Sequence, residues 1–265
     1  MDKIAFIGMG NMGQTMLKGA LSFFDNDALC FYDHKEDKRS NISDTLNVLS
    51  FNTSEECVKA SKYIILSIKP QVYESFLHEI SKSLTPEHIV ISLSPTFKIE
   101  KLKEMLPAQT RVIRAMPNTP AMVGEGMTGL CIDNSPYSDD ELKIIENFFS
   151  SFGRFSFVKE DLMSAVVCAS GSSPAYAYVF IEALADSVVK YGLSRKDAYE
   201  FAAQTLLGSA KMVLDTGIAP SVLKDNVCSP GGTTIRAIEA LEENGFRNAI
   251  FKATKACYDK CESEE

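Results

Sequence analysis

Residues 3–13 read Lys-Ile-Ala-Phe-Ile-Gly-Met-Gly-Asn-Met-Gly, and this stretch decides the fold of the first part of the chain. The apolar run before Gly8 predicts a strand, and the amphipathic segment Met12–Phe24 predicts a helix directly after it. Gly8 permits a tight turn, Gly10 lets the main chain approach a pyrophosphate, and Gly13 lets the helix pack closely on the strand. The helix N-terminus then faces the phosphates. This context predicts a dinucleotide site, with a ligand-free glycine-rich turn as the alternative.

The first 160 residues alternate strand-like apolar runs with amphipathic helical segments. Such alternation predicts an α/β fold, a Rossmann-type doubly wound parallel sheet with helices on both faces. Strands buried on both faces should be apolar throughout, as Ile64–Leu66 and Ile89–Ile91 are. The expected strands are Lys3–Ile7, Ala28–Tyr32, Tyr63–Ile68, His88–Leu93, Arg111–Ala115, Leu130–Ile132 and Phe155–Val158. The expected helices are Met12–Phe24, Thr53–Ala60, Tyr73–Leu84 and Asp139–Phe152.

The second part of the chain lacks strand-like runs and predicts three or four helices. Ser194 followed by Asp197 is typical of a helix start, and Gly217 falls where a helix should end. Because 265 residues exceed what one core usually serves, two domains are expected. We predict a dinucleotide-binding domain over residues 1–160 and an all-α C-terminal dimerisation and substrate domain over residues 161–265.

The predicted helices of the second domain are too apolar for a surface bundle that stands alone. In Ala198–Leu214, apolar or small residues occupy nearly every position, and a helix that is apolar all round is buried. About a hundred residues cannot bury several such helices among themselves. We therefore expect a second copy of the chain to cover them in an obligate homodimer; packing on the chain's own first domain is the alternative.

Composition narrows the class of protein. The net charge is −8 and Lys and Arg form no run, which disfavours nucleic acid as a partner. The longest apolar runs, such as Tyr63–Ile68, are strand-sized, so no membrane span is expected. The first residues lack the order of a secretion signal, and seven scattered cysteines predict no disulfide framework, so we expect a cytoplasmic enzyme. Cys257 and Cys261 have no nearby His, so no metal site is expected.

The second predicted strand ends at an acid and is followed by bases. Asp33 lies 20 residues after Gly13, the spacing at which an acid usually binds the adenosine ribose of NAD. His34 and Lys35 follow at once, with Lys38 and Arg39 close behind, and could hold the 2′-phosphate of NADP. A solvated helix start explains the same bases. The sequence therefore leaves the preference between NADH and NADPH open.

Another candidate cofactor segment is Ser67–Gln71, at the predicted carboxyl end of a strand, where such folds bind ligands. Lys69 could approach the cofactor's phosphates or ribose. As a lone Lys before Pro70, it could equally be a turn residue.

The positions of the histidines and lysines limit which reactions the chain could catalyse. Oxidation of an alcohol needs a base, usually His or Lys. His34, His78 and His88 all lie in the first domain, and the helix expected to open the second domain carries no Lys before Lys190. A 3-hydroxyacid dehydrogenase would therefore lack its base.

Reduction of a C=N bond has a lighter requirement, because an imine is already electrophilic and needs only a hydrogen-bond partner for its nitrogen. Residues 225–235 read Asp-Asn-Val-Cys-Ser-Pro-Gly-Gly-Thr-Thr-Ile, a turn that leads into the helix expected over Thr234–Glu242. This helix start offers hydroxyl groups and main-chain N–H groups suited to a carboxylate. A helix cap without further function is the alternative.

Four segments resemble one known family along the whole chain, in the same order. Val227–Glu242 is similar to the signature of pyrroline-5-carboxylate reductases, as are Val112–Pro120, followed by Gly124-Glu125-Gly126, then Ser173–Tyr176 and Ala203–Met212. The resemblance implies hydride transfer from NADPH or NADH to the C=N bond of 1-pyrroline-5-carboxylate, giving L-proline. It also implies a homodimer that often assembles further, for example into a decamer.

The resemblance also implies roles for individual residues. Thr234 would hydrogen-bond the pyrroline nitrogen as the catalytic residue. The substrate carboxylate would be bound by Val227, Ser229, Gly231, Gly232, Thr233 and Thr234. The cofactor would be contacted by Gly8, Asn11, Met12, Ile68, Lys69, Pro70 and Asn118, beside Gly10, Gly13, Asp33, His34 and Lys35 from the motif analysis.

The chain departs from the family pattern at three places. Ser94-Pro95-Thr96 replaces a turn of small residues, Ser173 stands where Gly is common, and Asp33 stands where many members have a neutral residue. Three alternatives stay open: a reductase of another cyclic imine, a 3-hydroxyacid dehydrogenase-like enzyme, and a nucleotide-sensing or structural dimer that has lost turnover.

Overall fold

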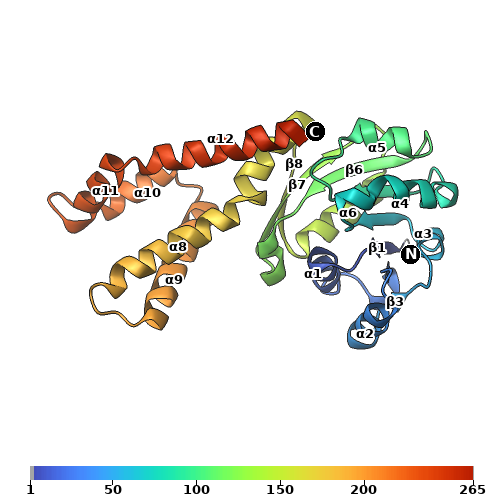
Figure 1. The fold of residues 1–265 in the computed structure, drawn as a ribbon, viewed down its shortest axis with the longest axis horizontal. Coiled ribbons are helices and arrows are strands. Elements are labelled where there is room, and N and C mark those ends of the chain that lie inside the picture. The colour runs from blue at the N-terminus through green and yellow to red at the C-terminus, as the bar shows by residue number, and fades with distance from the viewer. Residues whose placement is uncertain (1–2, 265) are drawn as a thin grey trace. The chain divides into compact units, whose positions relative to one another are not determined.

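The computed structural model describes residues 3–264 (Figure 1), which form two compact units. The N-terminal unit comprises the described residues up to Ser172 together with Tyr258–Glu264, and the helical unit is Ser173–Cys257. The domain boundary predicted between residues 160 and 161 stays a prediction.

The N-terminal unit contains one eight-stranded sheet in the order β3-β2-β1-β4-β5-β6-β7-β8 (Figure 1). The strands are β1 Ile4–Ile7, β2 Leu29–Tyr32, β3 Leu49–Ser50, β4 Tyr63–Leu66, β5 Ile89–Ser92, β6 Arg111–Met116, β7 Gly126–Ile132 and β8 Gly153–Phe157. All neighbours are parallel except β6 and β7. A doubly wound α/β fold is thus confirmed.

The antiparallel pairing of β7 differs from the wholly parallel sheet expected from the sequence. Residues 117–125 connect β6 to β7 through the short helix η4 (Thr119–Val123). A parallel pair needs a crossover of about a dozen residues or more, so this short connection returns the chain antiparallel.

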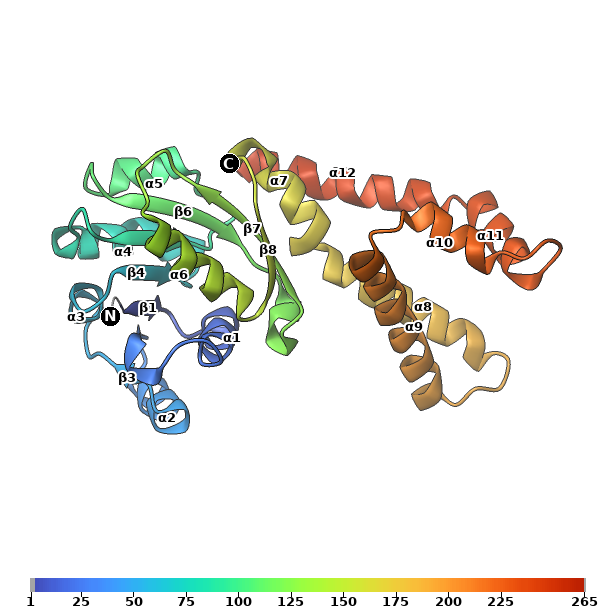
Figure 2. The same cartoon turned by 180° about the vertical axis from the view of Figure 1, so that it is seen from behind.

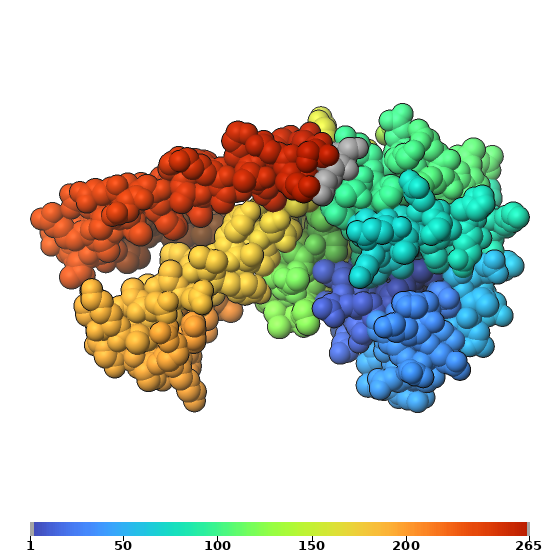
Figure 3. All heavy atoms as spheres, viewed as in Figure 1, coloured from blue at the N-terminus to red at the C-terminus, as the bar shows by residue number. Residues whose placement is uncertain are grey.

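Successive strand residues point to opposite faces and build two cores. Phe6, Phe31 and Ile65 belong to one core, whereas Ile7 and Ile64 belong to the other. The first core is covered by α1 (Asn11–Ala20), α2 (Glu36–Leu46) and α6 (Asp139–Ser150). The second is covered by α3 (Ser54–Lys59), α4 (Tyr73–Ile80) and α5 (Ile99–Met105). Figures 1 and 2 show the molecule from opposite sides, and in Figure 3 the teal and green atoms of residues in and around α4 and α5 form part of the surface.

Three elements of this unit have no counterpart among the expected ones. Helix α2 is strongly polar and buries only Ile42, so it lacks an apolar stripe. Helix α5 spans seven residues and β3 only two, too short for a periodic pattern to emerge.

The helical unit is built from α8 (Ser173–Val189), α9 (Arg195–Thr216), α10 (Pro220–Val227), α11 (Thr233–Glu243) and most of α12 (Phe246–Glu264). A short helix α7 (Met163–Val166) and a π-helical turn (Val167–Gly171) precede it. The Ser194 hydroxyl accepts the Asp197 N–H at 3.2 Å, and Gly217 ends α9 with a φ of 66°. The predicted start and end of this helix are therefore confirmed.

Within one chain, the helical unit leaves much apolar surface uncovered. Its described core is small and contains Ala185, Ala198 and Ala202. Val179 and Phe201 are each 64% exposed.

The helical stretch Glu160–Val189 is long and apolar enough to cross a membrane, by length and composition alone, although the sequence suggested only strand-sized apolar runs. Core helices of soluble proteins pass the same test.

A buried ion pair fastens α6 to the sheet. Glu141 is 7% exposed, and its carboxylate accepts hydrogen bonds from Arg111 Nη1 at 2.7 and 2.8 Å. Lys62 Nζ lies 3.0 Å from Glu141 Oε1, and the Ser138 N–H completes a capping box. Burial alone would raise the pKa of Glu141, but the Ser138 N–H and the two cations outweigh it and lower the pKa to about 2.

Glu141→Gln should destabilise the protein in a pH-dependent way. The folded-state pKa lies below the ordinary value of 4.5, so the stabilisation is present above about pH 4.5 and is lost as the pH falls toward 2. We expect the free energy of unfolding to fall by about 3 kcal/mol at pH 7 and by much less at pH 3. Urea unfolding at both pH values measures this difference.

Glu146→Gln, at an exposed position of the same helix, is the control and should change stability by less than about 0.5 kcal/mol. An equal loss for Glu141→Gln at both pH values would contradict the ion-pair account.

Candidate functional site

The carboxyl ends of the parallel strands meet at one edge of the sheet. Strands β2 and β4 flank β1, so the chain's winding reverses direction beside β1. In folds of this kind, ligands bind at the strand carboxyl ends beside such a reversal. The loops after β1, β2, β4, β5 and β6 all lie at this edge, and these loops and the first turn of α1 carry every residue predicted to bind the cofactor.

The glycine-rich turn fits a dinucleotide pyrophosphate. Gly8 has a φ of 88°, and a Cβ on it would lie 2.7 Å from the Ser67 carbonyl oxygen. A Cβ on Gly13 would lie 2.2 Å from the Gly8 carbonyl oxygen. Gly10 differs, since it adopts an ordinary φ of −66° and a Cβ there would meet no atom within 4 Å. Gly8 and Gly13 thus permit the turn to fold, and Gly10 leaves open the space where a phosphate would approach.

The first turn of α1 lies next to this open space. Gly10 is the N-cap of α1 and makes no side-chain cap, so the first main-chain N–H groups of the helix are available to an anion. Asn11, exposed, and Met12, half-buried, are the first two helical residues. The turn and the helix start together provide what a pyrophosphate needs.

Asp33 ties the end of β2 to the glycine-rich turn. Its carboxylate is buried, with Oδ2 accepting the Met9 N–H at 2.8 Å and Oδ1 accepting the Lys35 N–H at 3.0 Å. Lys38 Nζ lies 3.3 Å from Oδ2. Burial alone would raise the pKa of Asp33, but these hydrogen bonds and the Lys38 charge lower it below its ordinary value. His34 and Lys35 have exposed side chains.

The end of β4 supports the turn from the other side. The Ser67 N–H donates to the Ile7 carbonyl at 2.9 Å. The Ile68 side chain packs against Gly8, close enough that a Cβ on the glycine would meet its Cγ2 at 2.8 Å. Lys69 is exposed, and Pro70 opens the short helix η2 (Pro70–Val72). The predicted residues Ile68, Lys69 and Pro70 therefore follow one another along the same edge.

A buried tyrosine connects the ends of β4 and β5. The Tyr73 hydroxyl donates to the Leu66 carbonyl at 2.9 Å, and Ser92 Oγ and the Leu93 N–H both lie 3.2 Å from it. Burial raises the pKa of Tyr73 to about 12, so the hydroxyl keeps its proton. The apolar pattern around Tyr73 indicated only a helix and did not reveal this role.

A buried arginine positions the turn Ser94-Pro95-Thr96. Arg114 is 1% exposed, and its Nη2 donates to the Pro95 carbonyl at 2.5 Å. Its Nη1 lies 3.5 Å from Glu160 Oε1. The sequence carried a signal for this residue, because a charged side chain inside the apolar strand Arg111–Met116 needs a buried partner.

Asn118, just after the end of β6, forms side-chain hydrogen bonds to two other parts of the chain. Its Nδ2 donates to the Ser170 carbonyl at 3.0 Å, and its Oδ1 accepts the Met127 N–H at 2.9 Å. Asn118 thus links β7 with the π-helical turn while it lies at the edge where a cofactor contact was predicted.

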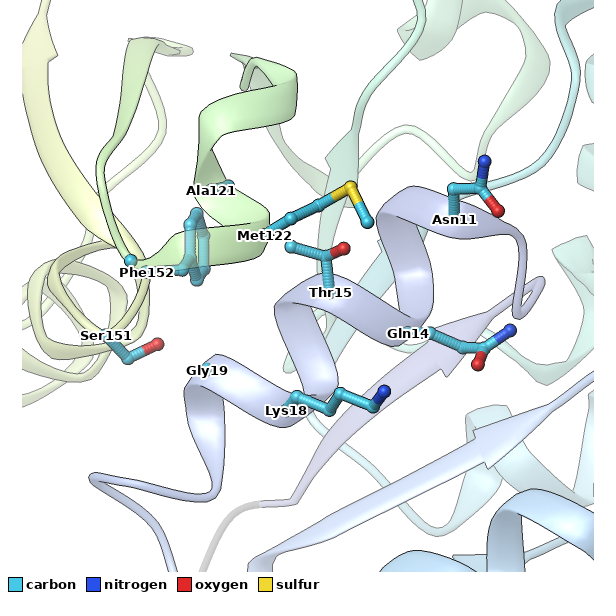
Figure 4. Close-up of a pocket in the computed structure, with 10 residues that line it drawn as sticks. Asn11, Gln14, Thr15, Lys18, Gly19, Ala121, Met122, Ser151 and Phe152 are labelled. Atoms are coloured by element: carbon cyan, nitrogen blue, oxygen red, sulfur yellow. The ribbon is translucent and has the colours of Figure 1, made fainter. Parts of the chain in front are cut away.

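A cavity of about 340 Å³ runs along α1 (Figure 4). It is lined by Asn11, Gln14, Thr15, Lys18, Gly19, Ala121, Met122, Gly124, Ser151 and Phe152. Figure 4 shows Met122 of η4 reaching over α1 toward Thr15. Asn11 is the one predicted cofactor residue among these lining residues. The sequence gives no sign of this cavity, since η4 meets α1 only in the folded chain.

The predicted substrate residues lie in the helical unit, between the last residue of α10 and the start of α11. Val227 is 67% exposed, Ser229 is exposed and Thr234 is half-buried. Gly231 has a φ of 70°, and the Gly232 N–H donates to the Ser229 carbonyl at 3.0 Å. Gly232 is the N-cap of α11 and makes no side-chain cap, so main-chain N–H groups of Thr233 and Thr234 point out of the helix start.

Among residues 3–264, no cluster of three or more His, Cys, Asp or Glu side chains forms a metal-binding group. The structure thus places a glycine-rich turn and an uncapped helix start at the carboxyl edge of the sheet in one unit, and an uncapped helix start with nearby hydroxyl groups in the other.

Comparison with known proteins identifies relatives of the whole chain. A family model described as pyrroline-5-carboxylate reductase dimerisation matches residues 160–264, and one described as NADP oxidoreductase, coenzyme F420-dependent, matches residues 3–96. The pyrroline-5-carboxylate reductase of Escherichia coli strain K12 is 40% identical over 262 residues, covering 98% of this chain and 97% of the relative. The enzyme of that name from Arabidopsis thaliana is 38% identical over 256 residues, covering 96% and 92%.

Solved structures agree with these relatives. A pyrroline-5-carboxylate reductase from Coxiella burnetii has a TM-score of 0.93 at 29% identity, covering 100% of this chain and 98% of the other. The pyrroline carboxylate reductase of Plasmodium falciparum, solved with NADP bound, has a TM-score of 0.87 at 30% identity, covering 99% and 98%.

Two glycine substitutions should separate folding of the turn from binding by it. Gly10→Ala adds a methyl group in open space, so the melting temperature should stay within about 2 °C while affinity for NADH and NADPH falls about tenfold or more. Gly13→Ala places a methyl group against the Gly8 carbonyl oxygen and should lower the melting temperature itself. Thermal unfolding and nucleotide titration measure the two effects. Unchanged nucleotide affinity in a folded Gly10→Ala variant would remove this turn from the binding site.

Proposed function

The chain belongs to the pyrroline-5-carboxylate reductase family, and on that premise we propose that it reduces the C=N bond of 1-pyrroline-5-carboxylate to give L-proline, the last step of proline biosynthesis. It is an NAD(P)H-dependent oxidoreductase. The observation that carries the proposal is 40% identity to the Escherichia coli enzyme over 98% of the chain. This identity extends over the predicted substrate domain as well as the nucleotide-binding domain. Similarity confined to the nucleotide-binding fold would not indicate the substrate.

The cofactor residues of the N-terminal unit fit a nicotinamide dinucleotide. We propose that Gly8, Gly10 and Gly13 admit the pyrophosphate to the start of α1, where Asn11 and Met12 lie. The remaining proposed cofactor contacts are Asp33, His34, Lys35, Ile68, Lys69, Pro70 and Asn118. When bound, the reduced nicotinamide supplies a hydride from its C4 atom. The residues of this edge bind and orient it.

Thr234 is the proposed catalytic residue. It is the second residue of α11, where its hydroxyl can hydrogen-bond the ring nitrogen as the imine carbon receives the hydride and the nitrogen keeps or gains a proton. The uncapped start of α11 suits the substrate carboxylate, which we propose is bound by Val227, Ser229, Gly231, Gly232, Thr233 and Thr234.

An alcohol-oxidising reaction is disfavoured by the residues of α8. This helix carries no Lys, and Lys190 follows only after its last residue, with its Nζ 5.8 Å from the ring centroid of Tyr191. Another cyclic imine satisfies the same chemistry and is the alternative that the assay must separate.

We propose that the enzyme acts as a cytoplasmic homodimer, with assembly beyond the dimer, such as a decamer, as a finer possibility. The match to a family dimerisation model over residues 160–264 supports a homo-oligomer. An apolar groove of about 730 Å³ supports a second copy as its cover, and Val179, Phe180 and Leu206 are among its lining residues. We also propose that the two domains divide between residues 160 and 161. The proposed partner, besides a second copy of the chain, is the small substrate, and neither nucleic acid nor a membrane is proposed.

The direct test is oxidation of NADH and NADPH, separately, by the purified protein with DL-pyrroline-5-carboxylate, while proline is quantified. Oxidation with an equal amount of proline is expected. If the folded protein binds nucleotide but forms no proline, the proposed substrate is wrong and other cyclic imines become the candidates.

Thr234→Ala should lower kcat about 10²-fold, the scale of lost proton-transfer assistance. Thr234→Ser keeps the hydroxyl and should stay within about tenfold of the unmodified enzyme. Steady-state kinetics at saturating substrate measures both. A Thr234→Ala variant with full kcat would exclude the hydroxyl from the mechanism.

Val179→Asp should weaken the dimer, because it places a charge on the exposed apolar face of α8 that a partner would bury. Light scattering coupled to size-exclusion chromatography should show a shift of mass toward the monomer. Asn41→Asp adds the same charge at an exposed position of α2 and should leave the mass unchanged. A Val179→Asp variant that remains fully dimeric would place the interface elsewhere.

A further inference from the structure

We propose that Asp33 makes this enzyme bind NADH more tightly than NADPH, by holding a buried carboxylate where the 2′-phosphate of NADPH would lie. The inference rests on the proposed use of a nicotinamide dinucleotide. An acid at the end of the second strand of this fold reaches the adenosine ribose, which places Asp33 beside the 2′ position.

The Asp33 carboxylate cannot easily turn away from an incoming phosphate. It is 4% exposed and is held by the Met9 N–H at 2.8 Å and the Lys35 N–H at 3.0 Å. Rotation would leave the buried Met9 N–H without its acceptor, a cost that proteins rarely accept. The lowered pKa of Asp33 keeps the group charged at neutral pH. A 2′-phosphate would therefore meet a fixed negative charge.

Three of the four bases that follow Asp33 already contact it, and the fourth, Lys35, has an exposed side chain. Lys38 Nζ lies 3.3 Å from Asp33 Oδ2. Arg39 Nη1 donates to the Asp33 main-chain carbonyl at 2.8 Å, and its guanidinium lies 5.8 Å from the ring centroid of Tyr32. His34 Nδ1 lies 3.4 Å from Asp33 Oδ1. To bind a 2′-phosphate, Lys38 and Arg39 would have to leave these contacts. The negative charge of the Asp33 carboxylate would then lie beside the phosphate without a cation to offset it.

A ribose with a free 2′-hydroxyl meets no such conflict. A carboxylate has about four acceptor positions, and the two main-chain N–H groups and Lys38 Nζ occupy three of them. The fourth position, on Oδ1, can accept a hydrogen bond from a ribose hydroxyl of NADH. Asp33 thus favours the unphosphorylated ribose and disfavours the phosphorylated one through the same atoms.

The test is calorimetric titration of the full-length protein with NADH and with NADPH, without any imine substrate. We expect the unmodified protein to bind NADH about tenfold or more tightly than NADPH, since like charges placed side by side weaken binding strongly. Asp33→Asn keeps an oxygen for the Met9 N–H and removes the charge. It should move the ratio of the two dissociation constants toward NADPH by about tenfold or more.

Two further variants separate the placement of the charge from its presence. Asp37→Asn removes one negative charge from an exposed position in the first turn of α2 and should leave the ratio within about twofold. Lys38→Met removes the cation nearest Asp33 and should weaken NADPH no more than it weakens NADH. Melting temperatures establish that each variant is folded.

Tighter binding of NADPH by the unmodified protein, or an unchanged ratio in folded Asp33→Asn, would overturn the proposal, as would failure to bind either nucleotide. A selective loss of NADPH affinity in Lys38→Met would also overturn it, by assigning the phosphate to Lys38. The titration contains no imine, so its result does not depend on the proposed reaction. A protein that binds NADH selectively but forms no proline in the assay would contradict the proposed reaction and still support the role of Asp33.

Discussion

The close approach of the β1–α1 turn to the end of β4 is the constraint on which the nucleotide-binding unit depends. Gly8 and Gly13 lie where a side chain would overlap main-chain oxygen atoms of Ser67 and of Gly8 itself. Because these atoms approach so closely, α1 starts directly at the carboxyl edge of the sheet. Its uncapped N–H groups then face the space left open at Gly10. The proposed pyrophosphate site thus depends on steric contact within the turn rather than on any charged side chain.

Buried polar groups hold the other loops of this edge in place. Asp33 joins the β2 end to the turn, Tyr73 joins the ends of β4 and β5, and Arg114 holds the loop after β5. Asn118 joins the β6 end to β7 and to the π-helical turn. Each polar group is costly to bury unpaired, so each contact disfavours movement of its loop. The edge is therefore organised before a nucleotide arrives, which lowers the entropic cost of binding.

The helical unit follows a different physical rule. Its helices bury little apolar surface among themselves, and large side chains such as Val179, Phe201 and Phe251 remain exposed in one chain. An exposed apolar surface of this kind usually marks an interaction site. The proposed dimer would cover this exposed apolar surface.

The sequence by itself determined the α/β class, the glycine-rich turn, the caps of α9 and the family, because these depend on local spacing and on residues that are near one another in the chain. It did not determine the antiparallel β7, whose direction depends on a short connection, or α2, whose polar surface hides its helical period. Nor could it find the roles of Tyr73 and Arg114. It placed Asp33 near the ribose but left its effect open, because the bases that follow it could be assigned either to a phosphate or to solvent. Only the tertiary structure decided that Lys38 and Arg39 are bound to Asp33, since such pairings depend on distances that a linear sequence does not contain.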